Sequence, residues 1–135
     1  MGITAMEDGK TESRTQRGLR LINEMLGEES KTRMELNAAA GFGARFTQLA
    51  IDFAFGTMWA DATLPRRDLS LVTIGALVAA HQYEELAHHV RIGLANGLTP
   101  TEIEQAITYL AAYTGFPAAR GGLATARAVI EAAKG

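Results

Sequence analysis

The stretch Gly97-Leu98-Thr99-Pro100-Thr101-Glu102-Ile103 contains the sharpest helix boundary in the sequence. Thr99 fits the N-cap, Pro100 fits the first helical position, and Glu102 can return a hydrogen bond to the N-cap. Apolar residues then recur at helical spacing, at Ile103, Ala106, Ile107, Leu110 and Ala111. The pattern predicts a helix that begins at Pro100, buries one face and ends at Gly115.

Further helices are predicted on both sides of this boundary. Pro117 opens a final alanine-rich helix that ends near Lys134, and another helix runs roughly from Tyr83 to Asn96. The stretch from Leu69 to Ala80 is apolar nearly all round. Such a helix is expected at the centre of the core or at a subunit interface.

The N-terminal half contains two more helical patterns. One follows Arg14 and stops at Gly27, which fits a helix ended by a glycine. The other covers residues 44–55, where apolar residues recur at i, i+3, i+4, i+7 and i+8 and predict one buried face, which Gly56 then interrupts. The members of this face are Phe46, Leu49, Ala50, Phe53 and Ala54. Residues 30–41 are weakly apolar and give no clear prediction.

No stretch alternates apolar and polar residues as a strand does. We therefore predict an all-α fold, a single-domain bundle of about six helices over residues 14–135, preceded by a mobile tail over residues 1–13. A chain of 135 residues with 47% hydrophobic content can bury one sizeable core.

Composition limits the classes of function. The chain contains no cysteine, which excludes disulfides, thiolate metal sites and thiol chemistry. Its 13 basic and 15 acidic residues are spread along the chain, so no basic stripe indicates nucleic acid binding. Residues 1–14 lack the apolar core of a signal peptide, and no apolar stretch is long enough to span a bilayer. We expect a cytoplasmic protein whose partner is a small molecule or a like subunit.

Titratable residues concentrate between His81 and His89. His81, Glu85 and His89 fall at i, i+4 and i+8, and share one stripe if the helix begins early enough. His89 is expected at the edge of the apolar face, where partial desolvation can tune its proton affinity, whereas His88 belongs to a wetter stripe. Alternatively, Glu85 and His89 form a surface pair worth roughly a few tenths of a kcal/mol. A metal site would need a second Glu-x-x-His motif, which the sequence lacks.

Two other features each allow two interpretations. Arg66 and Arg67 could bind a substrate carboxylate through a bidentate fork, or could form a solvated corner or an inter-subunit ion pair. Trp59, the only tryptophan, could line a pocket or belong to the core. The residues alone leave these alternatives open.

In their order and spacing, five segments resemble the carboxymuconolactone decarboxylase family. They are Gly56–Trp59, Leu64–Arg67, Glu84–Arg91, Gly97–Ile103 and Ala112–Ala119. The likeness runs from about residue 15 to the C-terminus and is closer to the decarboxylase branch than to the alkylhydroperoxidase branch. The Cys-x-x-Cys of the latter falls here on Gln82 and Glu85, and its histidine falls on His89. Peroxidase activity is therefore excluded.

The resemblance implies an all-α bundle that assembles into homotrimers or hexamers and needs no metal or organic cofactor. It implies decarboxylation of a carboxylated lactone, such as 4-carboxymuconolactone, to an enol-lactone in protocatechuate and β-ketoadipate catabolism. In this interpretation His89 is the proton donor, and Glu85 orients it and raises its pKa. Arg66 or Arg67 holds a substrate carboxylate, and Trp59 lines the pocket.

Two histidines depart from the family pattern. The position of His81 is usually small and that of His88 is usually apolar, so this chain adds two imidazoles around the expected site. We expect both to contact the substrate. They also keep an alternative open, in which the chain is a paralogue acting on another lactone or keto acid, or a non-catalytic binding or assembly protein.

Overall fold

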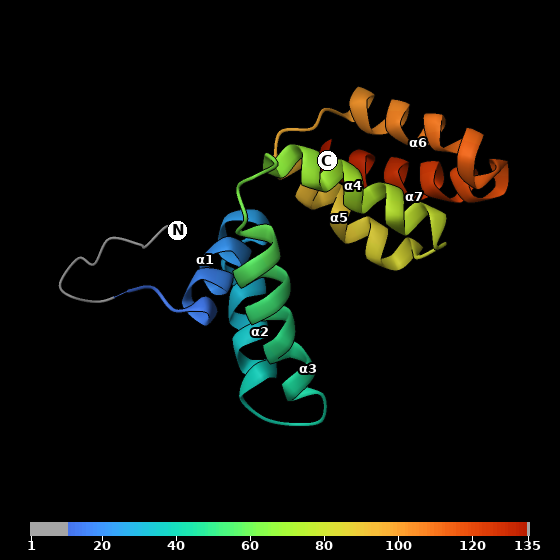
Figure 1. The fold of residues 1–135 in the computed structure, drawn as a ribbon. Helices are drawn as coiled ribbons and strands as arrows, with labels where there is room; N and C mark the ends of the chain where they lie inside the picture. Colours follow the sequence, from blue (N-terminus) through green and yellow to red (C-terminus); the bar gives the residue numbers. More distant parts are fainter. Residues whose placement is uncertain (1–10, 135) are drawn as a thin grey trace. The chain divides into compact units, whose positions relative to one another are not determined.

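The computed structural model describes residues 11–134, which are mainly helical and contain no strand (Figure 1). The all-α prediction is confirmed. Most of the predicted mobile tail, residues 1–10, lies outside the described residues. In chain order the elements are α1 (Arg14–Leu26), α2 (Glu28–Ala39), α3 (Ala44–Leu49), the π-helix η1 (Ala50–Trp59), α4 (Arg66–Ala79), α5 (Tyr83–Ala95), α6 (Pro100–Thr114) and α7 (Phe116–Lys134). None of these helices has the length and apolar character needed to cross a membrane.

Residue contacts divide the chain into two compact units. The first unit, Met1–Ala62, contains α1, α2, α3 and η1, and the second unit, Thr63–Gly135, contains α4 to α7. Each unit has its own internal packing and is described separately below.

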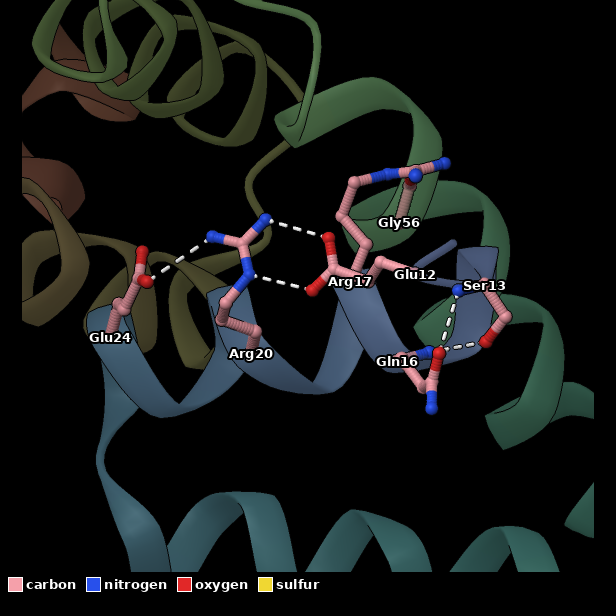
Figure 2. Close-up of polar contacts among 7 residues, drawn as sticks. All are labelled: Glu12, Ser13, Gln16, Arg17, Arg20, Glu24 and Gly56. Carbon is pink, nitrogen blue, oxygen red and sulfur yellow. Dashed lines mark hydrogen bonds and ion pairs between the residues drawn. The ribbon is translucent and has the colours of Figure 1, made fainter. Parts of the chain in front are cut away.

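The first unit begins with the helix that the sequence predicts after Arg14, and the structure adds a capping box at its start. The Ser13 hydroxyl accepts from the backbone N–H of Gln16 at 3.0 Å, and the Gln16 side chain accepts from the Ser13 N–H at 2.7 Å (Figure 2). Just before the cap, the Glu12 carboxylate accepts two hydrogen bonds from Arg20, at 2.8 and 3.1 Å, which lower the pKa of Glu12. The helix ends at Gly27, whose φ of 98° favours glycine. Local polar contacts therefore fix the start of α1.

Helix α1 and η1 approach each other so closely that only glycine fits at two positions. A Cβ on Gly18 would collide with the carbonyl oxygen of Ile51, and a Cβ on Gly56 would collide with that of Arg14. Arg17 adds a hydrogen bond of 2.8 Å from its Nε to the Gly56 carbonyl (Figure 2). The crossing is therefore a contact of backbone on backbone, which a side chain at either glycine would separate.

The buried face predicted for residues 44–55 is wrong. Phe46 and Phe53 are 77% and 57% exposed, whereas Ile51 and Phe55 are buried. The helix also continues through Gly56, because residues 50–59 form a π-helix in which hydrogen bonds join i and i+5. Phe46 lies in α3, and the side chains that turn inward still recur every three to four residues, at Gln48, Ile51 and Phe55, so the predicted face has the wrong phase.

The second unit has a core of side chains from all four of its helices. Helix α5 packs against α4 and α7, and α6 packs against α4 and α7. The core consists of Ile74, Val78, Leu86, Val90, Leu98, Ile103, Ile107, Ala118, Ala119, Ala126 and Val129. The predicted capping box of α6 is confirmed, with Thr99 and Glu102 exchanging hydrogen bonds of 3.0 and 3.1 Å.

Candidate functional site

The turn from α4 to α5 decides which histidines share a helix. The N–H of His81 donates to Val78 at 3.1 Å, and the N–H of Gln82 donates to Leu77 at 2.9 Å, which is the Schellman pattern of helix termination. His81 takes the left-handed position of this motif, with φ of 57°. Because α5 begins only at Tyr83, the predicted stripe of His81, Glu85 and His89 is wrong in its first member.

Tyr83 belongs to none of the motifs named above, yet it connects this turn to α7. Its hydroxyl donates to the Ala118 carbonyl at 3.1 Å and lies 3.5 Å from Nδ1 of the exposed His81. The ring fits only because residue 121 is glycine, since a Cβ there would collide with the Tyr83 ring. The adjacent glycines Gly121 and Gly122, unusual inside a helix, were the available signal of such a close approach.

Glu85 and His89 are brought together on α5, as their spacing predicts. The His89 side chain is only 14% exposed, and its Nε2 lies 4.0 Å from Oε2 of Glu85, which is 62% exposed. His89 lies three residues after the buried Leu86 and directly before the buried Val90. The core therefore covers one edge of the imidazole, and Nδ1 is buried. His89 is therefore largely shielded from solvent, whereas Glu85 is exposed to it.

Burial decides the proton affinity of His89. It lowers the pKa of the imidazole below its usual value of 6.5, and the charge of His88 lowers it further. Glu85 acts in the opposite direction, as expected from its position, but burial is the larger effect. The net direction is therefore opposite to the one the sequence predicted, and at neutral pH His89 is an uncharged imidazole that can accept a proton.

The remaining histidine of α5 has a different neighbour within hydrogen-bonding distance. His88 is exposed, and its Nδ1 lies 3.3 Å from Nη1 of Arg91. Within residues 11–134, no group of three or more histidine or carboxylate side chains is arranged to hold a metal ion. The chemistry available around His89 is therefore that of an imidazole, a carboxylate and an apolar wall.

The arginines that begin α4 lie elsewhere in the second unit. Nη2 of Arg67 contacts Oε2 of Glu102 at 2.5 Å, across from α4 to α6. Ser70 lies one turn after Arg66 and is buried. Its hydroxyl oxygen accepts a hydrogen bond of 3.0 Å from the side-chain amide of Asn96, the C-cap of α5. Asn96 is seven residues beyond His89, or roughly 10 Å along the helix. Arg66 and Arg67, which we call the arginine corner, therefore lie toward the end of α5 that is opposite to Glu85. The second unit does not bring this corner to His89.

Trp59, the last candidate, ends η1 in the first unit and is half-buried. Its ring therefore belongs to a different unit from His89.

Comparisons with known proteins agree on one family. Residues 44–128 match the model described as the carboxymuconolactone decarboxylase family. A protein of Acinetobacter baylyi named 4-carboxymuconolactone decarboxylase is 34% identical over 120 residues, which cover 89% of each chain. Nitrosuccinic acid decarboxylase npaB of Metarhizium robertsii is 32% identical over 100 residues, 74% of this chain and 69% of that protein. Both relatives are decarboxylases by name.

Proposed function

The chain belongs to the carboxymuconolactone decarboxylase family and is a carboxy-lyase, and from this premise we propose that its substrate is a carboxylated lactone such as 4-carboxymuconolactone. The products are carbon dioxide and an enol-lactone, formed without a metal or organic cofactor in aromatic-compound catabolism. The observation that carries the proposal is the nearly buried, uncharged His89 with Glu85 beside it.

The reaction breaks the bond between a ring carbon and its carboxylate. The electron pair moves through the ring alkene into the lactone carbonyl and gives a dienolate, which then takes a proton on carbon. Burial beside Leu86 and Val90 favours this step, because a dry site does not stabilise the departing carboxylate as water does.

His89 delivers the proton in this mechanism. It is uncharged in the free protein, so it must first gain a proton. The negative charge of the bound substrate raises its pKa, and the exposed Glu85 offers a route for the proton from solvent. As imidazolium, His89 then stabilises the developing oxyanion before it donates the proton.

A cation for a substrate carboxylate is assigned to the arginine corner. Arg67 faces α6, so Arg66 is the member we assign to the substrate. Because this corner lies toward the far end of α5, we place Arg66 in the site of a neighbouring copy within a cytoplasmic homotrimer or hexamer. Trp59 lines the pocket in this proposal, and His81 and His88 contribute to its polar edge.

The first test follows the ultraviolet absorbance of 4-carboxymuconolactone and the release of carbon dioxide. His89→Gln should lower kcat by about 10²- to 10⁴-fold, the usual contribution of a general acid, while the helical circular dichroism stays unchanged. Glu85→Gln should cause a smaller loss, and Glu84→Gln, its exposed neighbour on α5, serves as the matched control. Folded wild-type protein that leaves this lactone unchanged would reject the proposed substrate.

The second test addresses the origin of Arg66. His89→Gln and Arg66→Gln proteins, each inactive alone, should regain part of the activity when they are unfolded and reassembled together, because mixed assemblies contain sites with both native residues. If both variants are inactive and the mixture gains nothing, Arg66 does not act from a neighbouring copy.

His81 and His88 favour an alternative substrate, because both are imidazoles that depart from the family pattern. His81 lies in the α4–α5 turn, and His88 lies on α5. Turnover of another lactone, a keto acid or nitrosuccinic acid, in place of the carboxylated lactone, would retain the carboxy-lyase chemistry and change its substrate.

A further inference from the structure

A groove with a volume of about 580 Å³ lies on the second unit, between α4 and α6. Its walls are mostly apolar and include Leu71, Val72, Ala106 and Leu110. The volume falls within the range of small-molecule sites, roughly 300 to 1,000 Å³. The groove can therefore hold a small organic molecule.

One end of the groove carries a charged pair. Arg67 and Glu102 both line it and contact each other at 2.5 Å. The other carboxylate oxygen of Glu102 accepts from the Thr99 N–H at 3.0 Å, so the α6 cap holds this carboxylate in place. Arg67 has five N–H donors in a planar fork, and its side chain is 37% exposed. The contact with Glu102 thus holds the guanidinium at one end of a mostly apolar groove.

We propose that this groove binds an aromatic or branched aliphatic monocarboxylate. The hydrocarbon body lies against Leu71, Val72 and Leu110, and the carboxylate binds Arg67 as a charge-assisted hydrogen-bond acceptor. A single cation at one end of an apolar groove selects for a single carboxylate, because a second one would lie unpaired against apolar side chains.

This groove is distinct from the site at His89. The residues that line it come from α4 and α6, whereas Glu85 and His89 belong to α5. Helix α4 separates the two, because it turns Ser70, Ile74 and Val78 into the core and Val72 outward. Binding in the groove can therefore be measured without reference to the decarboxylation.

Gly75 gives a direct way to block the groove. A Cβ at this position meets only Leu110 Cδ2, at 3.8 Å, which is ordinary contact. Alanine is therefore accommodated, whereas the longer side chain of leucine must extend into the groove. Gly75→Ala and Gly75→Leu are matched variants that differ mainly in how far they fill it.

The experiment titrates the full chain with phenylacetate by calorimetry, with neutral phenylacetamide and the dicarboxylate phthalate in parallel. Phenylacetate should bind more tightly than either. Arg67→Gln should lower the affinity for phenylacetate by about tenfold or more, because one charged hydrogen bond is lost. The affinity for phenylacetamide should stay unchanged. Gly75→Leu should abolish binding of phenylacetate, and Gly75→Ala should retain it. Glu102→Gln, which removes the competing carboxylate, should strengthen it.

Three results would overturn the proposal. One is no binding of phenylacetate up to about 10 mM, beyond which affinity is weaker than that of ordinary specific ligands. A second is binding that neither Arg67→Gln nor Gly75→Leu weakens, because the ligand then lies elsewhere. The third is a second copy of the chain in the groove, which would appear as dissociation of the assembly by Val72→Glu in sedimentation experiments.

Discussion

The first and second units are both helical, yet they are held together by different contacts. The second unit gathers eleven buried residues into one core cluster. Among the described residues of the first unit, the buried large apolar side chains are Leu21, Ile22, Met25, Ile51 and Phe55. Its exposed ones are Leu36, Phe42, Phe46, Leu49, Phe53 and Met58. The first unit instead relies on the close approach of α1 and η1 and on polar contacts such as that of Thr15 with Asp52, at 2.6 Å.

This difference shows that helix formation and core formation have separate physical requirements. A helix needs local hydrogen bonds and caps, whereas a core needs apolar side chains from several helices to face one another. Both units expose large apolar side chains, but among the described residues of the first unit the exposed ones outnumber the buried ones, which indicates a surface that packs against another molecule. The first unit is therefore the part whose packing we expect to depend on an assembly.

The largest expected effect comes from a matched pair of leucines, one in each unit. Leu86 is fully buried in the second unit, and Leu36 is 68% exposed in the first. Leu86→Ala should lower the free energy of unfolding by about 2–5 kcal/mol, because it leaves a cavity. Leu36→Ala should change it by less than about 0.5 kcal/mol. Urea denaturation measures both, and equal losses would contradict the contrast between the units.

The next effect distinguishes glycines that serve different purposes. Gly18→Ala should destabilise the protein by about 1–3 kcal/mol, because the new methyl group forces α1 away from η1. Gly75→Ala, also within a helix, should stabilise it by up to about 1 kcal/mol, because alanine loses less backbone entropy. Melting temperatures of the two variants should shift in opposite directions. A neutral Gly18→Ala would show that backbone contact does not hold the first unit.

A smaller effect concerns the strained turn of the second unit. His81 holds a φ of 57°, which costs a residue with a Cβ about 1 kcal/mol. His81→Gly should therefore stabilise the protein by about that amount, and His81→Ala, which keeps the Cβ, should not. Destabilisation by His81→Gly would mean that the contact of the ring with Tyr83 outweighs the strain.

The smallest effect is a dependence of stability on pH. The pKa of His89 is lowered in the folded protein, so the unfolded chain binds this proton more readily. Stability should therefore be fully present above the unfolded value of 6.5 and should decrease as the pH falls below it. His89→Gln should flatten this part of the profile. A slope that persists in the variant would assign the titration to another group.

The parts of the fold that depend on local signals could be predicted from the sequence. The capping box at Thr99 lies within four residues, so it fixed the start of α6, and Gly27 fixed the end of α1. The π-helix was not foreseen, because its wider turn depends on how η1 packs against α1. The buried face of residues 44–55 was misassigned because which side of this helix meets α1 also depends on that packing.

The candidate site follows the same division. Glu85 and His89 lie one turn apart on one helix, so their spacing was sufficient to predict the contact. The sign of the pKa shift was not predictable, because it depends on how completely the core covers His89. The contact of Arg67 with Glu102 joins two helices, and no spacing along the chain indicates it.

The fit of Tyr83 against Gly121 also constrains the order in which this protein can change. As long as the Tyr83 ring keeps its present position, a Cβ at position 121 would collide with it, so only glycine fits there. Once residue 83 becomes small, position 121 is released, and a side chain acquired there would in turn prevent the tyrosine from returning. A protein with the tyrosine and one without it would therefore tolerate different substitutions at position 121.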